Sequence, residues 1–231
     1  MRYPTLVVLA LMAIGVGPLT AQENVRERAR ESLPSQVFQG VDALATEMVE
    51  AGIPPEPLFN KALEGLAKRV PSDRLLPAIT RYAGQLRLAR DAFGDVGGGP
   101  LYVAGADALQ RGIDVEVLRS LGRREGDSPE PSPMAVLVLA DLVEAGIPAD
   151  RALGVVREAL RLRTGEQQML GMTARVRQMM RQGQSPQEAA DQVRRSLQRG
   201  RGGGIGPPVP PGSEPVTSGR RQGGNGRGGG S

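Results

Sequence analysis

The sequence contains no cysteine, no histidine and no tryptophan, and aromatic residues make up only 3% of its 231 positions. The first two absences exclude disulfides, thiol nucleophiles and metal sites built on thiolate or imidazole ligands. The scarcity of aromatic residues leaves Leu, Val, Ala, Ile and Met to form the hydrophobic core, and such a core suits helices better than sheets. The sequence therefore predicts an all-α protein with no sheet.

Catalytic motifs are missing as well. The chain has no Gly-x-Ser-x-Gly nucleophile elbow and no Gly-x-x-x-x-Gly-Lys-Ser/Thr phosphate loop. The glycine run at 97–99 precedes Pro100, which has no N–H to offer a phosphate. Glu50 and Glu144 occupy equivalent places in a repeated segment, and duplication explains their likeness more simply than acid–base chemistry. We expect no enzymatic activity, no cofactor and no bound metal.

The N-terminus has the features of an export signal. Arg2 gives it a positive charge, and Gly17 and Pro18 break an apolar run before the small residue Ala21. That run, residues 5–16, is about a dozen residues long, which is typical of a signal peptide and too short to span a bilayer. We expect residues 1–21 to be removed, leaving an exported, periplasmic or extracellular chain without a transmembrane span. A buried N-terminal helix and an uncleaved membrane anchor are the alternatives.

The rest of the chain divides into three parts. Residues 22–34 are polar and charged, which predicts an exposed leader that is either a short exposed helix or a mobile segment, and residues 35–199 have apolar residues at helical spacing, which predicts a domain of helical hairpins. Within this domain, residues 134–143 are so apolar that we expect a central, mostly buried helix, and the glycine-rich segment 94–100 is a candidate hinge. Residues 200–231 are rich in Gly, Pro, Ser and Arg and cannot bury enough apolar surface to offset the entropy of ordering, so we expect a disordered tail.

A repeated turn is the most informative feature of the helical part. The segment Val-Glu-Ala-Gly-Ile-Pro occurs at 49–54 and again at 143–148, and looser copies lie around Val70, Gly112 and Gly183. Glycine ends a helix because it adopts the left-handed conformation without penalty, and a Pro, Asp or Ser two residues later opens the next helix. We therefore predict about eight or nine short helices, stacked as hairpins with an internal duplication.

Charge is distributed unevenly along the chain. Residues 37–150 carry 11 basic and 17 acidic side chains, a net charge of −6, whereas residues 151–231 carry 14 basic and 5 acidic side chains, a net charge of +9. We interpret this either as solvated helix faces with a solubilising tail, or as a basic region that contacts anionic lipid, polysaccharide or the acidic half of a neighbouring copy. Nucleic acid is disfavoured, because the tail has no aromatic residues on which bases could stack. The candidate contacts are Arg194, Arg195, Arg199, Arg201, Arg220, Arg221 and Arg227.

Methionines form a stripe between residues 166 and 182. Met169, Met172, Val176 and Met179 follow the spacing i, i+3, i+7, i+10, and Met180 lies beside them. Thioethers bind Cu(I), but without a His or Cys ligand the stripe is better explained as an adaptable apolar seam, or as a groove for a partner helix. The leading hypothesis is an exported, non-enzymatic interaction or scaffolding protein that binds an unidentified envelope protein. The alternative is a peripheral binder of an anionic envelope surface.

Overall fold

The computed structural model describes residues 19–94, 97–123 and 129–200, which form ten α-helices and no strand. The helices are α1 (Leu19–Ser32), α2 (Ser35–Glu50), α3 (Glu56–Ala67), α4 (Ser72–Phe93), α5 (Gly99–Gln110), α6 (Val115–Gly122), α7 (Pro133–Glu144), α8 (Ala149–Arg161), α9 (Glu166–Arg181) and α10 (Pro186–Arg199). The predicted all-α fold is confirmed, with one or two more helices than expected. The predicted signal peptide lies outside the described residues except for 19–21, and so does the predicted tail except for Gly200.

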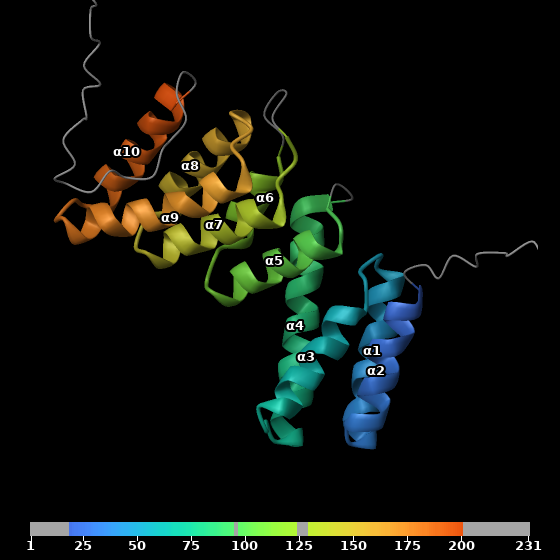
Figure 1. The fold of residues 1–231 in the computed structure, drawn as a ribbon. Coiled ribbons are helices and arrows are strands. Elements are labelled where there is room, and N and C mark those ends of the chain that lie inside the picture. The colour runs from blue at the N-terminus through green and yellow to red at the C-terminus, as the bar shows by residue number, and fades with distance from the viewer. Residues whose placement is uncertain (1–18, 95–96, 124–128, 201–231) are drawn as a thin grey trace, which may run out of the picture.

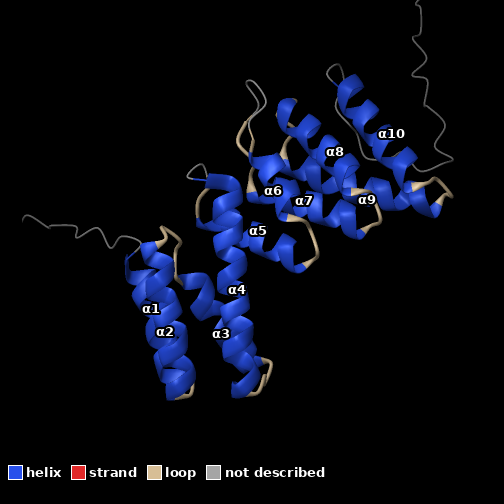
Figure 2. Cartoon of the chain, turned by 180° about the vertical axis from the view of Figure 1, so that it is seen from behind, coloured by secondary structure: helices blue, strands red, loops and turns tan. Residues whose placement is uncertain are grey.

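The helices stack in two layers because most of them pack against the next but one along the chain. α5, α7 and α9 form one layer, and α4, α6, α8 and α10 follow one another in the other. In the same way α1 packs on α3, and α2 packs on α4. The 22-residue helix α4 joins an arm made of α1–α4 to the array α5–α10 (Figure 1). Seen from behind, the helices are linked by short connections (Figure 2).

An aliphatic core runs through the stack. Its largest fully buried side chains are Met, Leu and Ile residues such as Met48, Leu86 and Leu139. Helix α7 buries six of its twelve residues, which confirms the expected central buried helix. Each large apolar side chain that is fully buried stabilises the fold by roughly 1.5–3 kcal/mol, and the aromatic residues Phe59, Tyr82, Phe93 and Tyr102 are buried in the same core.

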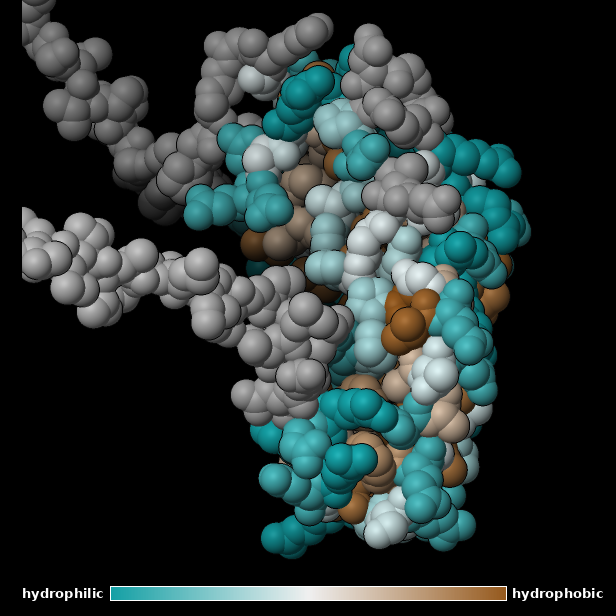
Figure 3. Space-filling model, turned by 90° about the vertical axis from the view of Figure 1, so that its right-hand side faces the viewer, coloured by the Kyte–Doolittle hydropathy of each residue, from teal (hydrophilic) through white to brown (hydrophobic). Residues whose placement is uncertain are grey.

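Residues 22–32, for which the sequence allows a short exposed helix or a mobile leader, belong to α1. The charged side chains of residues 26–31 are exposed, but α1 packs on α3, and Ala29 and Leu33 are buried. Val25, Ala29 and Leu33 are spaced four residues apart, so they share one face, and the charged residues occupy the other. Arg26 binds Asp42 of α2 through two hydrogen bonds of 2.7 and 2.8 Å. On the side of the molecule where α1 and α2 lie, hydrophilic residues alternate with hydrophobic patches (Figure 3).

The same turn ends six of the helices. After α2, α3, α5, α7, α8 and α9 one residue has a positive φ, and the next residue donates its N–H to the carbonyl five positions earlier, at 2.8–3.2 Å. This is the Schellman arrangement, which satisfies carbonyls at the helix end. The predicted glycine turns are confirmed at Gly52, Gly112, Gly146 and Gly183. At the other two turns the residue with positive φ is Arg69 or Arg163, which was not anticipated.

The candidate hinge lies between α4 and α5, and residues 95 and 96 are outside the described part. On either side of this gap, the Tyr102 hydroxyl lies within hydrogen-bond distance of the carbonyls of Gly94 (3.0 Å) and Gly97 (2.8 Å). α4 and α5 also approach closely, since a Cβ atom on Gly105 would lie 2.8 Å from the Cβ atom of Ala89. These contacts pack α5 closely against α4 next to the candidate hinge.

Candidate functional site

The last two helices of the array, α9 and α10, form the candidate site. The turn at Gly183 joins them, and a capping box starts α10: the Ser185 hydroxyl accepts the N–H of Glu188 (3.3 Å), and the Glu188 carboxylate accepts the N–H of Ser185 (2.9 Å). The hydrogen bonds from Ser185 hold the pKa of Glu188 below its usual value. This reciprocal cap orients α10 against α9.

A groove of about 690 Å³ runs between α9 and α10. Its floor is apolar and consists of Met172 and Met179 from α9 with Val193 and Leu197 from α10. Its polar lining consists of Gln167, Gln168, Arg175, Gln178, Arg181, Gln182, Gln192 and Ser196. No acidic side chain is found among the described residues that line it. The groove therefore combines an apolar base with a rim of amide and guanidinium donors.

Small residues keep the groove open. Gly171 and Ala174 line it from α9, and a Cβ atom added to Gly171 would meet no atom within 4 Å. A glycine inside a helix costs roughly 0.5–1 kcal/mol relative to alanine, and nothing packs closely enough against Gly171 to require it for the fold. The absence of a side chain at Gly171 leaves a space in the groove that a side chain of another chain can occupy.

The structure divides the predicted methionine stripe between two faces of α9. Met169 and Val176 are buried, 2% and 0% exposed, and belong to the core. Met172 and Met179 are also buried, but they line the groove. Met180 lies elsewhere, in a cavity of about 410 Å³ that it shares with Arg177 and Arg181 of α9 and with the end of α7. Two of the five predicted residues therefore contribute to the groove.

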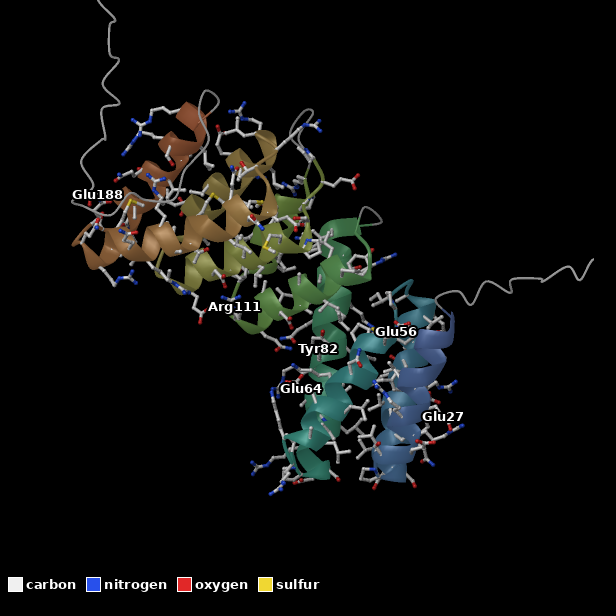
Figure 4. All side chains as sticks on the ribbon, in the orientation of Figure 1. Glu27, Glu56, Glu64, Tyr82, Arg111 and Glu188 are labelled. Atoms are coloured by element: carbon white, nitrogen blue, oxygen red, sulfur yellow. The ribbon has the colours of Figure 1, made fainter. Side chains whose placement is uncertain are left out.

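Oppositely charged side chains alternate along the layer α5–α7–α9. Arg111, at the end of α5, donates to Asp141 (2.5 Å) and Glu144 of α7. Glu144 also lines the cavity of Met180 together with Arg177 and Arg181 of α9. The positions of Arg111 near the turn after α5 and of Glu188 at the far end of the array can be followed in Figure 4. The last layer helix, α9, thus presents positive charge at the open end of the stack.

The candidate anion contacts are only partly within the described residues. Arg194, Arg195 and Arg199 lie on α10 and are exposed. Arg194 lines a third cavity, of about 290 Å³, with three further arginines. Arg201, Arg220, Arg221 and Arg227 lie outside the described residues.

The titratable residues Lys61, Glu64, Tyr82 and Asp107, from α3, α4 and α5, lie near one another, and none of them lines the groove. Burial raises the pKa of Tyr82 to about 12 and raises the pKa of Asp107 above its usual value. Lys61 lies over the Tyr82 ring, 5.6 Å from its centroid, and forms an ion pair with Glu64 at 3.2 Å. In the part of the chain that the structure describes, no group of three or more acidic residues is placed to hold a metal ion, and no helix has the length and apolar character to cross a bilayer.

Sequence reasoning identified the floor contributed by α9 but missed the α10 side and the rim. Val193 and Leu197 are four residues apart and mark the apolar face of α10, so their spacing could have indicated it. The architecture is a two-layer array of helical hairpins with an open groove at its C-terminal end. Comparison with known proteins gives no match to any family model, curated protein or solved structure.

Proposed function

We propose that this chain is a non-enzymatic scaffolding protein of the cell envelope that binds an amphipathic, acidic helix of a partner protein in the groove between α9 and α10. The observation that carries the proposal is the position of the groove at the open end of the array. Export is part of the proposal and is supported by the apolar run at residues 5–16.

The groove lies where a further helix of the array would pack. In the layer α5–α7–α9, α7 has α5 on one side and α9 on the other, whereas α9 has only α7 as a neighbour in that layer among the described residues. The face of α9 turned away from α7 carries Gly171, Arg175 and Gln178, which line the groove. A partner helix seated there would extend the stack by the same side-by-side packing that builds it.

The lining specifies the chemistry of the partner helix. The apolar floor requires apolar side chains at i, i+3 or i+4, and i+7 on one face. Arg175 and Arg181 flank that floor without an acidic residue in the described lining, so Asp or Glu on the flanks of the partner helix complements the site. A second copy of this chain fits less well, because two such grooves facing each other would bring four arginines together.

The test uses synthetic helical peptides and a variant that fills the groove. One peptide carries Leu on one face and Glu on the flanks, and a second carries Lys in place of Glu. Gly171→Leu places a side chain in the groove, and Gly84→Leu is the matched control, because Gly84 is also a helical glycine with no atom within 4 Å of an added Cβ atom. Fluorescence anisotropy of the labelled peptides measures binding to each protein.

We expect the wild type and Gly84→Leu to bind the Glu peptide and Gly171→Leu to lose that binding. The Lys peptide should bind about tenfold more weakly, which corresponds to two surface ion pairs of about 0.7 kcal/mol each. Equal binding by Gly171→Leu and Gly84→Leu, or equal affinity for the two peptides, would show that the groove is not the site.

The alternative function is a peripheral binder of anionic envelope surfaces. The support for it is the charge of the last three helices: residues 151–200 carry ten basic and four acidic side chains, a net charge of +6. One part of this basic region forms a defined pocket, which gives the alternative a sharper form.

A further inference from the structure

The third cavity, which Arg194 lines, is separate from the groove and lies on the opposite side of α10. It has a volume of about 290 Å³ and is lined by residues of α6, α8, α10 and the segment that precedes α7. Four of its lining residues are arginines: Arg123, Arg157, Arg161 and Arg194. Leu121, Pro129, Pro131 and Leu160 supply apolar walls. The pocket shares no lining residue with the groove between α9 and α10.

One carboxylate, that of Glu158, lines the pocket among these arginines. Arg161 donates two hydrogen bonds to it, at 2.9 and 2.6 Å. These bonds, assisted by the charges of Arg161 and Arg194, hold the pKa of Glu158 below its usual value despite partial burial. Glu158 therefore balances the charge of Arg161, and its carboxylate is the only one among the described residues that line the pocket.

The interface between α8 and α10 contains an ion pair one helical turn away from the pocket. There Arg151 of α8 forms an ion pair with Asp191 of α10 at 3.2 Å. Near Arg194, three residues further along α10, α8 presents Gly154, and a Cβ atom built on Gly154 would lie 3.9 Å from the Arg194 Nη1 atom. Neither Arg123 nor Arg194 forms an ion pair with any other described residue. At Gly154, α8 therefore presents no carboxylate to Arg194.

Two of the guanidinium groups are held in place before any ligand arrives. The Arg157 Nη2 atom donates to the Ser120 carbonyl at 2.5 Å, and the Arg157 side chain is half-buried. Arg161 is oriented by its paired bonds to Glu158. Such anchoring lowers the entropy cost of closing these side chains on an anion.

We propose that this pocket binds a phosphate group, carried either by a soluble phosphomonoester or by a lipid headgroup. Guanidinium forks that converge from α6, α8 and α10 match the several oxygens of a tetrahedral anion, and each fork can donate two parallel hydrogen bonds. Arg123 and Arg194, which form no ion pair with another described residue, supply two positive charges for a doubly charged phosphate. The apolar walls leave room for a short organic group attached to it.

The experiment compares two double variants of the full chain that remove the same charge. Arg123→Gln with Arg194→Gln removes two pocket arginines that form no ion pair with another described residue. Arg195→Gln with Arg199→Gln is the matched control, since both of these residues are exposed on α10 and neither lines the pocket. Circular dichroism checks that both variants keep the helix content of the wild type. A third variant, Gly154→Leu, places a bulky side chain beside Arg194 without removing charge.

Isothermal titration with inorganic phosphate and with glycerol 3-phosphate, and co-sedimentation with vesicles of phosphatidylcholine and phosphatidic acid, report binding. We expect the pocket variant and Gly154→Leu to weaken binding at least about tenfold, as for the loss of one charge-assisted hydrogen bond, while the control pair binds as the wild type does. Vesicle binding that glycerol 3-phosphate displaces identifies a headgroup site, and binding of the soluble anions alone identifies a phosphomonoester site.

Two results would overturn the proposal. The first is that neither the soluble phosphates nor the vesicles bind the wild type. The second is an equal loss in the two double variants, which would mean that a diffuse positive field, and not this pocket, attracts the anion. Because the peptide assay probes the other side of α10, either proposal can fail without the other.

Discussion

The residue with positive φ at each helix end offers the most direct test of the architecture. Gly146 has φ 93° in the turn between α7 and α8, and Arg163 has φ 53° in the corresponding turn between α8 and α9. We consider Arg163→Gly and Gly146→Ala, with Arg163→Ala as the control that removes the guanidinium but keeps the Cβ atom. Arg163 is exposed and has no ion pair among the described residues, so its substitution changes mainly the backbone preference.

The magnitudes follow from two opposing contributions. A residue with a Cβ atom pays roughly 1–2 kcal/mol in the left-handed region, and a glycine pays about 0.4–1 kcal/mol because it gives the unfolded chain more freedom. The φ of Arg163 is close to the left-handed optimum near +57°, so its strain is at the low end, and Arg163→Gly should stabilise by only about 0.5 kcal/mol. The φ of Gly146 is well beyond that optimum, so Gly146→Ala should destabilise by about 1–1.5 kcal/mol.

Steric clash should not add to the destabilisation expected for Gly146→Ala, because a Cβ atom on Gly146 would meet only the Met180 Cε atom, at 3.9 Å. Urea denaturation followed by circular dichroism measures the free energy of unfolding, and a change of 1 kcal/mol should move the melting temperature by about 2–4 °C. Arg163→Ala should be neutral. If Arg163→Gly destabilises the protein, or Gly146→Ala leaves it unchanged, then positive φ is not what ends these helices.

The two arginine turns also show where sequence reasoning stopped. Gly52, Gly112, Gly146 and Gly183 could be assigned to helix ends because glycine is the residue type that signals a left-handed conformation. An arginine in the same position carries no such signal, so the turn after α8 was not predicted. Arg69 and Arg163 nevertheless lie at the same distance after the glycines of the two copies of Val-Glu-Ala-Gly-Ile-Pro. The φ values explain why arginine is tolerated: 56° and 53° at the arginines, against 71–93° at these four glycines.

The buried stripe of the N-terminal helix was not predicted, for a different reason. Composition alone made residues 22–34 look like an exposed segment, because charged residues outnumber apolar ones. Val25, Ala29 and Leu33 nevertheless form a narrow stripe that is sufficient to pack α1 on α3. A stripe of three residues is below what a periodicity analysis over a short window can separate from chance.

The candidate site was predictable only in part, because its geometry depends on tertiary packing. The spacing i, i+3, i+7, i+10 from Met169 to Met179 identified an apolar stripe but could not say which of its residues face α7 and which face the groove. That division is set by the angle at which α10 crosses α9, which no local pattern encodes. The arginine pocket is less predictable still, since its residues come from positions as far apart as Arg123 and Arg194.

Two further predictions concern close packing and buried titration. Gly105→Ala should destabilise the protein by about 1–3 kcal/mol, because the new Cβ atom would lie 2.8 Å from the Ala89 Cβ atom. Gly84→Ala, with no atom within 4 Å of its Cβ atom, should stabilise the protein by up to about 1 kcal/mol. Equal urea midpoints for the two variants would contradict this. For Tyr82, burial, followed by the negative charge of Asp107, raises the pKa from 10.0 to about 12. The unfolded chain therefore releases this proton at a lower pH than the folded protein, so the contribution to stability is complete below pH 10 and is lost as the pH rises toward 12. Tyr82→Phe keeps the ring beneath the Lys61 ammonium group but has no proton to lose. Between pH 10 and pH 12 the wild type should accordingly lose more free energy of unfolding than Tyr82→Phe. Equal losses in the two proteins would show that burial does not raise the pKa of Tyr82.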